Sequence, residues 1–192
     1  MPFALVVLVA AATWRVFTLH IPGLSNFSPI MALAFCGGVY FRGRWQWLLP
    51  IAALTLSDLY IDHYYAREFH YEWAFGEAFV RALCFIAAAA AGRFVAQRRN
   101  WLNLFSGALG GSLLFYLVTN TLAWTSDGGY APTVAGWWQA MTVGHPQFQP
   151  TLFFFRNTLV SDLLFTTVFA LAMETSAQRQ GAPSLLGPRT TG

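Results

Sequence analysis

The chain has 192 residues, of which 56% are hydrophobic and only 10% are charged, and its formal net charge is +3. A soluble globular domain carries about 25% charged residues, so this composition excludes that class and indicates an integral membrane protein. The eleven basic residues are all arginines. Because they are scattered between apolar runs, they also argue against a nucleic-acid-binding surface.

Six apolar runs predict membrane-spanning helices, since a helix needs roughly 20 residues to cross a bilayer. They cover residues 2–20, 26–41, 47–61, 75–94, 102–123 and 151–173. The second and third runs are short for straight crossings. We therefore predict an all-α membrane protein with six transmembrane helices in one domain, residues 1–175. Residues 176–192 are rich in Gly, Pro, Ser and Thr and predict a flexible cytoplasmic tail.

The arginines outside the runs predict the orientation of the chain. With six spans, seven of them fall on one side, which the positive-inside rule makes cytoplasmic. They are Arg42, Arg44, Arg93, Arg98, Arg99, Arg179 and Arg189. Both termini are then cytoplasmic.

Two of the predicted loops on the opposite side are longer than those on the arginine-rich side and contain aromatic residues. Residues 62–73 predict an acidic and aromatic loop. Residues 124–150 form a longer connection, with Trp137 and Trp138 in a segment that could lie as an interfacial helix. Connections of more than about 15 residues are usually functional in a compact domain, so we expect the outer face to be the working face.

The fourth run carries three reactive side chains near its outer end. Glu77, Arg81 and Cys84 are four and three residues apart, which places them on one face of a helix. Each charge inside hydrocarbon costs roughly 2.5–3.5 kcal/mol, so these groups should face a protein interior or a wet cavity. The alternative is a Glu–Arg pair that anchors the helix end beside a cysteine that acts as a small hydrophobic residue.

Further polar residues are expected at a similar depth in the outer half of the membrane. The charged ones are Arg15, Asp58, Arg81, Arg156 and Asp162, and the amides are Asn120 and Asn157. Their convergence predicts a pocket open to the outside, because unpaired charges at this depth are costly. The alternative is a structural ion network that holds the spans together.

The sequence gives only weak indications of a metal site or of a catalytic cysteine nucleophile. The acidic residues and histidines near the outer end of the third run match no recognised metal-ligand spacing. No histidine is fixed beside Cys84 by the sequence, which a nucleophilic pair would need. Cys36 precedes Gly37 and Gly38, where close helix packing favours small residues, and we interpret it as a packing residue.

Four segments resemble the BtuM-type cobalamin transporters. They are NFSPIMALAFCGGVYF at 26–41, LLPIAALTLSDLYI at 48–61, GSLLFYLVTNTLAW at 111–124 and FFFRNTLVSDLLFT at 153–166. Those transporters are small bacterial inner-membrane proteins related to the substrate-binding S components of energy-coupling-factor transporters. The resemblance covers residues 15–172.

The resemblance implies a six-helix S-component fold, uptake of cobalamin across the bacterial inner membrane, and a membrane cysteine that ligates the corrinoid cobalt. The matching cysteine is Cys84, and a thiolate suits a soft transition-metal centre. We expect the cobalamin to bind without its own lower base. The expected cobalamin-binding residues are Cys84, Arg81, Glu77, Asp58, Arg156, Asn120, Tyr65 and Trp138.

One feature departs from ordinary S components, which often carry an Ala-x-x-x-Ala helix-docking pattern in the first span. Here Ala10, Ala11 and Ala12 are consecutive. We therefore expect a solitary transporter without a dedicated energising module. Two alternatives stay open: an S-component-like transporter of another vitamin, and a membrane thiol enzyme that uses Cys84.

Overall fold

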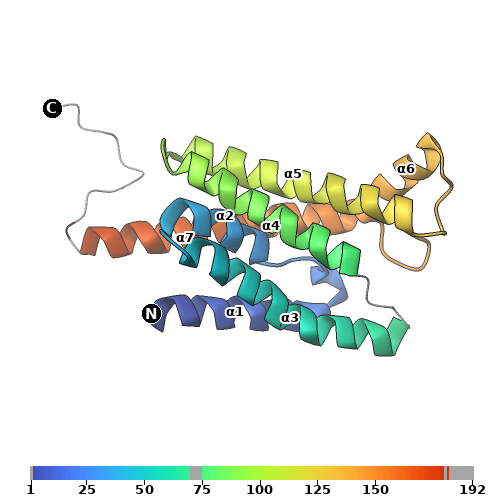
Figure 1. Cartoon of the computed structure of the whole chain (residues 1–192), viewed down its shortest axis with the longest axis horizontal. Coiled ribbons are helices and arrows are strands. Elements are labelled where there is room, and N and C mark those ends of the chain that lie inside the picture. Colours follow the sequence, from blue (N-terminus) through green and yellow to red (C-terminus); the bar gives the residue numbers. More distant parts are fainter. Residues whose placement is uncertain (1, 70–74, 180, 182–192) are drawn as a thin grey trace.

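The computed structural model describes residues 2–69, 75–179 and 181, and in this part the helices are joined by turns and irregular segments, with no strand. The long helices lie side by side along the long axis of the molecule (Figure 1). In order the elements are α1 (Pro2–Leu19), the 3-10 turn η1 (Pro22–Leu24), α2 (Ile30–Tyr40), α3 (Trp45–Phe69), α4 (Phe75–Val95), α5 (Trp101–Ser126), α6 (Val134–Met141) and α7 (Thr151–Arg179). The all-α prediction is confirmed for these residues.

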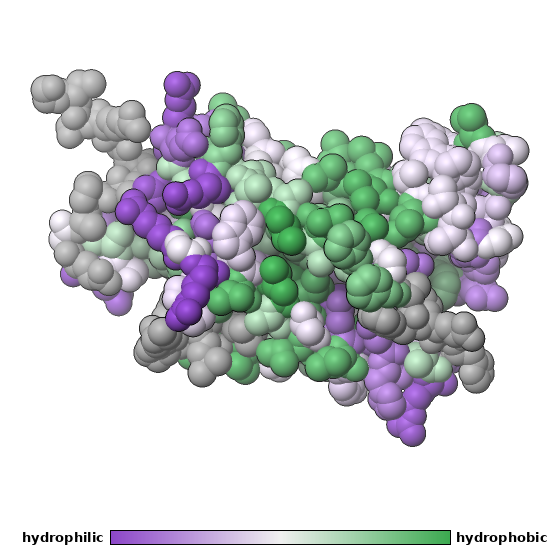
Figure 2. Space-filling view, viewed as in Figure 1, coloured by the Kyte–Doolittle hydropathy of each residue, from purple (hydrophilic) through white to green (hydrophobic). Residues whose placement is uncertain are grey.

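Three helices, α4, α5 and α7, are long and apolar enough to cross a membrane. Shorter apolar helices cover Val9–Leu19 and Ile30–Tyr40. Figure 2 shows an apolar zone across the middle of the visible face and hydrophilic side chains toward both ends. This distribution is typical of a membrane protein, because the apolar middle can meet lipid. The six-span topology stays a prediction.

The two ends of the bundle differ in charge. The amino end of α1, the carboxyl end of α7 and the α2–α3 and α4–α5 connections all lie at one end, on the left of Figure 1. We call it the arginine end, because it carries Arg42, Arg44, Arg93, Arg98, Arg99 and Arg179. These are six of the seven arginines predicted to share a side, and Arg189 lies outside the described residues. The other end, with η1 and α6, is called the α6 end.

The shortest of the central helices, α2, lies at the middle of the bundle. Residues 30–39 are all buried, and α2 packs against α1, α3, α4, α5 and α7. At about 1.5 Å per residue its 11 residues span about 16 Å. That is about half of the ~30 Å hydrocarbon core of a bilayer. The chain approaches α2 through an irregular segment after η1, which is partly exposed and becomes buried only at Pro29.

The closest approach of two helices is between α2 and α4. A Cβ on Gly38 would lie 1.9 Å from the carbonyl oxygen of Ala89, and one on Gly92 would lie 2.0 Å from that of Phe35. Glycine at these positions lets the two backbones touch, as small residues do between membrane helices. Cys36 lies on the same helix with 0% exposure, which agrees with a packing role.

Two predicted connections are now defined. The loop expected over 62–73 is wrong for its first part, because α3 continues to Phe69. Residues 62–69 contain neither Gly nor Pro, so nothing stops the helix where the apolar run ends.

The segment expected to form a helix within residues 124–150 does so as α6, with Val134 and Trp138 82% and 63% exposed, and its interfacial position stays a prediction. Helix α7 runs to Arg179, past the start of the predicted tail at residue 176, and residues 180 and 182–192 lie outside the described part.

The glycine contact predicts opposite effects for the same substitution on two helices. Gly92→Ala should destabilise the protein by about 1–3 kcal/mol, because its methyl group would collide with the backbone of Phe35. Gly110→Ala on α5 meets no atom within 4 Å and should stabilise by about 0.5–1 kcal/mol through helix propensity. The measurement is the free energy of unfolding in detergent micelles. Equal effects of the two variants would contradict the close α2–α4 approach.

Candidate functional site

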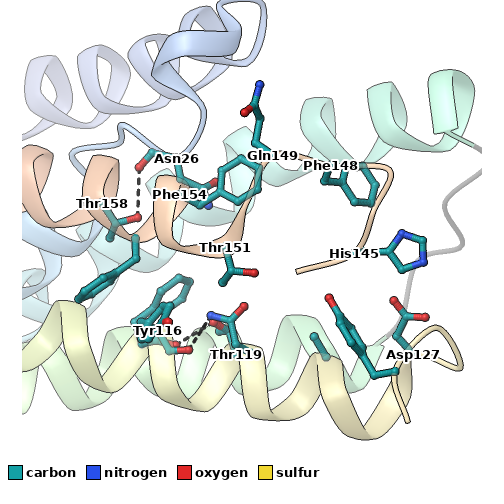
Figure 3. Close-up of a pocket in the computed structure, with 15 residues that line it drawn as sticks. Asn26, Tyr116, Thr119, Asp127, His145, Phe148, Gln149, Thr151, Phe154 and Thr158 are labelled. Carbon is teal, nitrogen blue, oxygen red and sulfur yellow. Dashed lines mark hydrogen bonds between the residues drawn. The ribbon is translucent and has the colours of Figure 1, made fainter. Parts of the chain in front are cut away.

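A cavity of about 280 Å³ lies at the α6 end (Figure 3). It is bounded by the last turns of α5, the first turns of α7, the connection between α6 and α7, and Asn26 before α2. Six aromatic side chains line it: Phe115, Tyr116, Tyr130, Phe148, Phe154 and Phe155. The remaining lining residues, apart from Ala123, are polar: Asn26, Thr119, Asn120, Asp127, His145, Gln149, Thr151 and Thr158. The lining thus combines flat apolar rings with hydrogen-bonding groups.

Tyr116 holds one wall of the cavity in place. Its ring stacks on Phe155 of α7, with centroids 4.2 Å apart and planes inclined by 30°. Its hydroxyl donates to the carbonyl oxygen of Met141 at the end of α6. One side chain therefore connects α5 to both α7 and α6. On the same face of α5, the Asn120 amide donates to the Tyr116 carbonyl oxygen at 2.7 Å, which fixes its orientation.

The rim carries the ionisable groups of the cavity. Figure 3 shows His145, from the α6–α7 connection, close to Asp127 at the end of α5. The Asp127 carboxylate accepts from the Gly129 N–H at 2.8 Å, and the ring of Tyr130 meets that of His145 edge-on at 6.2 Å. Burial, reinforced by the charge of Asp127, raises the pKa of Tyr130 above its ordinary value, so this phenol stays protonated near neutral pH. The rim thus offers one carboxylate, one imidazole and one phenol.

The segment before α2 closes the cavity on the α7 side. The Asn157 amide donates to the carbonyl oxygens of Gly23 and Ser25, both at 3.0 Å. Thr158 donates to the carbonyl oxygen of Asn26 at 3.4 Å. Asn26 has a φ of 62°, a left-handed conformation that asparagine tolerates better than most residues. Asn26 thereby becomes part of the cavity wall.

Three of the predicted intramembrane charges converge at a second polar centre, which we call the ion cluster. Arg15 on α1 donates to the Asp58 carboxylate on α3 and, at 2.7 Å, to the hydroxyl of Ser57. Arg81 on α4 lies 4.0 Å from the other Asp58 oxygen. These side chains are 16–22% exposed, so one carboxylate joins three helices in a largely buried place. The sequence analysis missed Ser57, for which it held no signal beyond the position next to Asp58.

The other predicted site residues lie elsewhere. Arg156 is exposed, with its guanidinium 4.6 Å from the ring centre of Phe153. Asp162 is 1% exposed and accepts from Ser112 of α5 at 2.6 Å. Of the remaining three, Glu77 and Tyr65 are half-buried on α4 and α3, and Trp138 is exposed on α6. The cavity contains only Asn120 of the predicted set.

Cys84 is buried, 6% exposed, and its thiol is free. It is not among the residues that line the cavity. Within the described part of the chain, no group of three His, Cys, Asp or Glu residues is placed to hold a metal ion. Direct ligation of cobalt by Cys84 stays a prediction.

Several cavity residues were not predicted, although the sequence held a partial signal. Tyr116, Thr119, Asn120 and Ala123 recur every three or four residues, which is one face of a helix. The long α5–α7 connection pointed to the same end of the molecule. What the sequence could not supply is the partner face on α7, where Phe155 and Thr158 complete the wall.

Residues 1–185 match the model of a family described as a family of unknown function, DUF6580. The chain belongs to this family. No curated protein and no solved structure matches the chain. Because the function of this family is unknown, membership does not indicate an activity. The cavity and the ion cluster are the features that bear on function.

The ion cluster predicts a specific loss of stability. Arg15→Ala leaves the Asp58 carboxylate without its hydrogen-bonded partner and should cost about 3 kcal/mol, the lower end for breaking a buried pair. Arg156→Ala removes an exposed arginine and should change stability by less than about 0.5 kcal/mol. Unfolding in detergent micelles measures both. Similar losses for the two arginines would contradict the ion cluster as a structural centre.

Proposed function

We propose that the protein is a membrane transport protein that captures a vitamin-sized organic solute at its α6 end. The observation that carries this proposal is the cavity of about 280 Å³, with aromatic walls and hydrogen-bonding side chains from three separate parts of the chain. Small-molecule sites typically enclose about 300–1,000 Å³ and combine apolar walls with a few placed polar groups. The cavity lies just below this range.

The lining favours a planar solute that is neutral or weakly basic. Stacked rings such as Tyr116 and Phe155 offer flat surfaces to an aromatic ring. Amides and hydroxyls can bind the polar edges of such a ring. The lining contains no arginine, and its single carboxylate is Asp127, which disfavours a strongly anionic solute.

We also propose that α1, α3, α4, α5 and α7 each cross the membrane, that α2 and the segment before it together make a sixth crossing, and that the arginine end lies in the cytoplasm of a bacterial cell. The gathering of six arginines at one end supports this orientation. The α6 end then faces outward, where it can meet solutes. Cysteines introduced at Gly43 and Gly129 should react with impermeant reagents from opposite sides of the membrane. Reaction from the same side would end this topology.

The sequence resemblance supports a vitamin as the solute, and cobalamin is the specific candidate that it names. A free thiol at Cys84, three residues from Arg81 of the ion cluster, supports the corrinoid version. A corrinoid is much larger than the cavity as it stands, so cobalamin would require the outer ends of the helices to part. A smaller vitamin with one or two rings requires no such opening, and the cavity volume favours it.

Filling the cavity should abolish solute binding. Thr119→Trp places a large side chain in the cavity, whereas Leu113→Trp places the same side chain on the exposed surface of the same helix. We expect the first to weaken binding at least tenfold, equivalent to about 1.4 kcal/mol, and the second to leave it unchanged. The measurement is calorimetric titration of purified protein with riboflavin, thiamine, biotin, pantothenate and cyanocobalamin. If no compound binds, or both variants lose affinity equally, the cavity is not the solute site.

The corrinoid version has its own test, in the visible absorption spectrum of purified protein incubated with cobalamin. Cys84→Ala should abolish the change caused by a thiolate–cobalt bond, while Cys36→Ala, also fully buried, should keep it. Loss only in Cys36→Ala would show that the other thiol is the ligand. Absence of any change in the unaltered protein would exclude thiol ligation of cobalamin and leave the smaller vitamins.

A further inference from the structure

Helix α7 buries a row of polar side chains although it is apolar enough to cross a membrane. Asn157, Ser161, Asp162, Thr166 and Glu174 are all buried and recur at helical spacing, so they follow one face. Asn157 and Ser161 have a clear structural role, because they bind backbone groups of the segment before α2. Asp162 is different, because a carboxylate at this depth is far more costly than an amide or hydroxyl.

The surroundings of Asp162 contain little that would stabilise a negative charge. Its Oδ2 accepts from Ser112, and its Oδ1 has no hydrogen-bond partner in the described part of the chain. The backbone of Ala32, in the first turn of α2, faces the carboxyl group. No ion pair joins Asp162 to an arginine or histidine among the described residues, in contrast to Asp58.

The ionisable side chains on the helices around Asp162 are few. Helix α2 contributes Cys36, which faces Asp162, and Tyr40. Helix α5 contributes only Tyr116, whose hydroxyl is occupied by Met141, and α6 contributes none. On α7 itself the others are Arg156, Glu174 and Arg179. A carboxyl group with one side-chain hydrogen bond and no cation beside it suits the neutral acid, because an unpaired buried charge is far more costly than an uncharged carboxyl group.

We propose that Asp162 is a proton-binding site inside the bundle and that its proton controls how the segment before α2 is held on α7. With the proton bound, the uncharged carboxyl group can remain dry between α2, α5 and α7. When the proton leaves to water, the new charge needs further donors. The first turn of α2 must then loosen from α7 to admit water.

The same segment connects Asp162 to the cavity. Ser28 and Ser161, next to Asp162, exchange two hydrogen bonds at 3.2 and 3.3 Å. Two residues earlier, Asn26 is held by Thr158 and forms part of the cavity wall. Loosening of this segment therefore opens the cavity, so a proton gradient across the membrane would bias solute capture and release. This last step rests on the proposed function, whereas the proton site itself does not.

Infrared difference spectra of the purified protein between acidic and alkaline pH test the proton site without any solute. We expect a carbonyl band of a protonated carboxylic acid that is lost at alkaline pH. It should be missing in Asp162→Asn, which keeps the size of the side chain and an acceptor for Ser112. Glu174→Gln and Asp58→Asn should retain it, and Ser112→Ala should shift it to higher frequency, because a hydrogen bond to the carbonyl is removed. A band that survives in Asp162→Asn, or no titrating band at all, overturns the proposal.

Hydrogen–deuterium exchange of the peptide over residues 25–31 tests the control of the segment. After correction for the intrinsic pH dependence of exchange, the unaltered protein should exchange faster at alkaline pH, whereas Asp162→Asn should exchange slowly throughout. The same pH dependence in both proteins would overturn the control by Asp162. Neither measurement uses a vitamin, so absence of vitamin binding would refute the proposed function alone.

Discussion

The constraint on which this fold depends is the short helix at its centre. Because α2 is only about half as long as the hydrocarbon core of a bilayer is thick, the chain before it is irregular, and its backbone groups need hydrogen-bond partners outside a helix. Neighbouring backbone groups supply some of them, and α7 supplies most of the side-chain partners through Asn157, Thr158 and Ser161. Trp14 of α1 supplies another, as its indole N–H donates to the Phe27 carbonyl oxygen at 3.1 Å. The polar face of α7 and the position of the cavity both follow from this requirement.

The two sides of α2 are held by different forces. Toward α4, Gly38 and Gly92 bring backbone against backbone, and any separation would leave a void between closely packed helices. Toward α7, the contacts of the segment before α2 are hydrogen bonds, each of which contributes only about 1 kcal/mol and can be exchanged for water. A conformational change is therefore easier between α2 and α7 than between α2 and α4. The cavity lies on the easier side, and the ion cluster of Arg15, Asp58 and Arg81 lies among α1, α3 and α4.

Much of the helical architecture was predictable, because apolar runs and charge distribution depend on the bilayer rather than on tertiary detail. The helical form of the runs is confirmed, and six of the seven arginines predicted to share a side lie at the arginine end. The half-length of α2 was not foreseen, although residues 26–29, Asn-Phe-Ser-Pro, held a signal, because serine and proline commonly stand where a helix begins. Depth along the chain also indicated which charges could meet, but not which helices are neighbours. Arg15, Asp58 and Arg81 meet because α3 packs against both α1 and α4. Asp162 lies on α7, and its carboxyl group contacts Ser112 of α5 rather than an arginine.

The exposed face of α6 connects the surroundings of the protein to the cavity. Val134 and Trp138 project from a short helix at one end of the bundle, where a bilayer would present its headgroups, the layer in which tryptophan is enriched. Tyr116 ties the end of this helix to the cavity through Met141. A change in lipid thickness or headgroup chemistry that moves α6 would therefore also move the cavity wall at Tyr116. A surrounding membrane would act in this way as an outer shell of the cavity, which a detergent micelle would reproduce only in part.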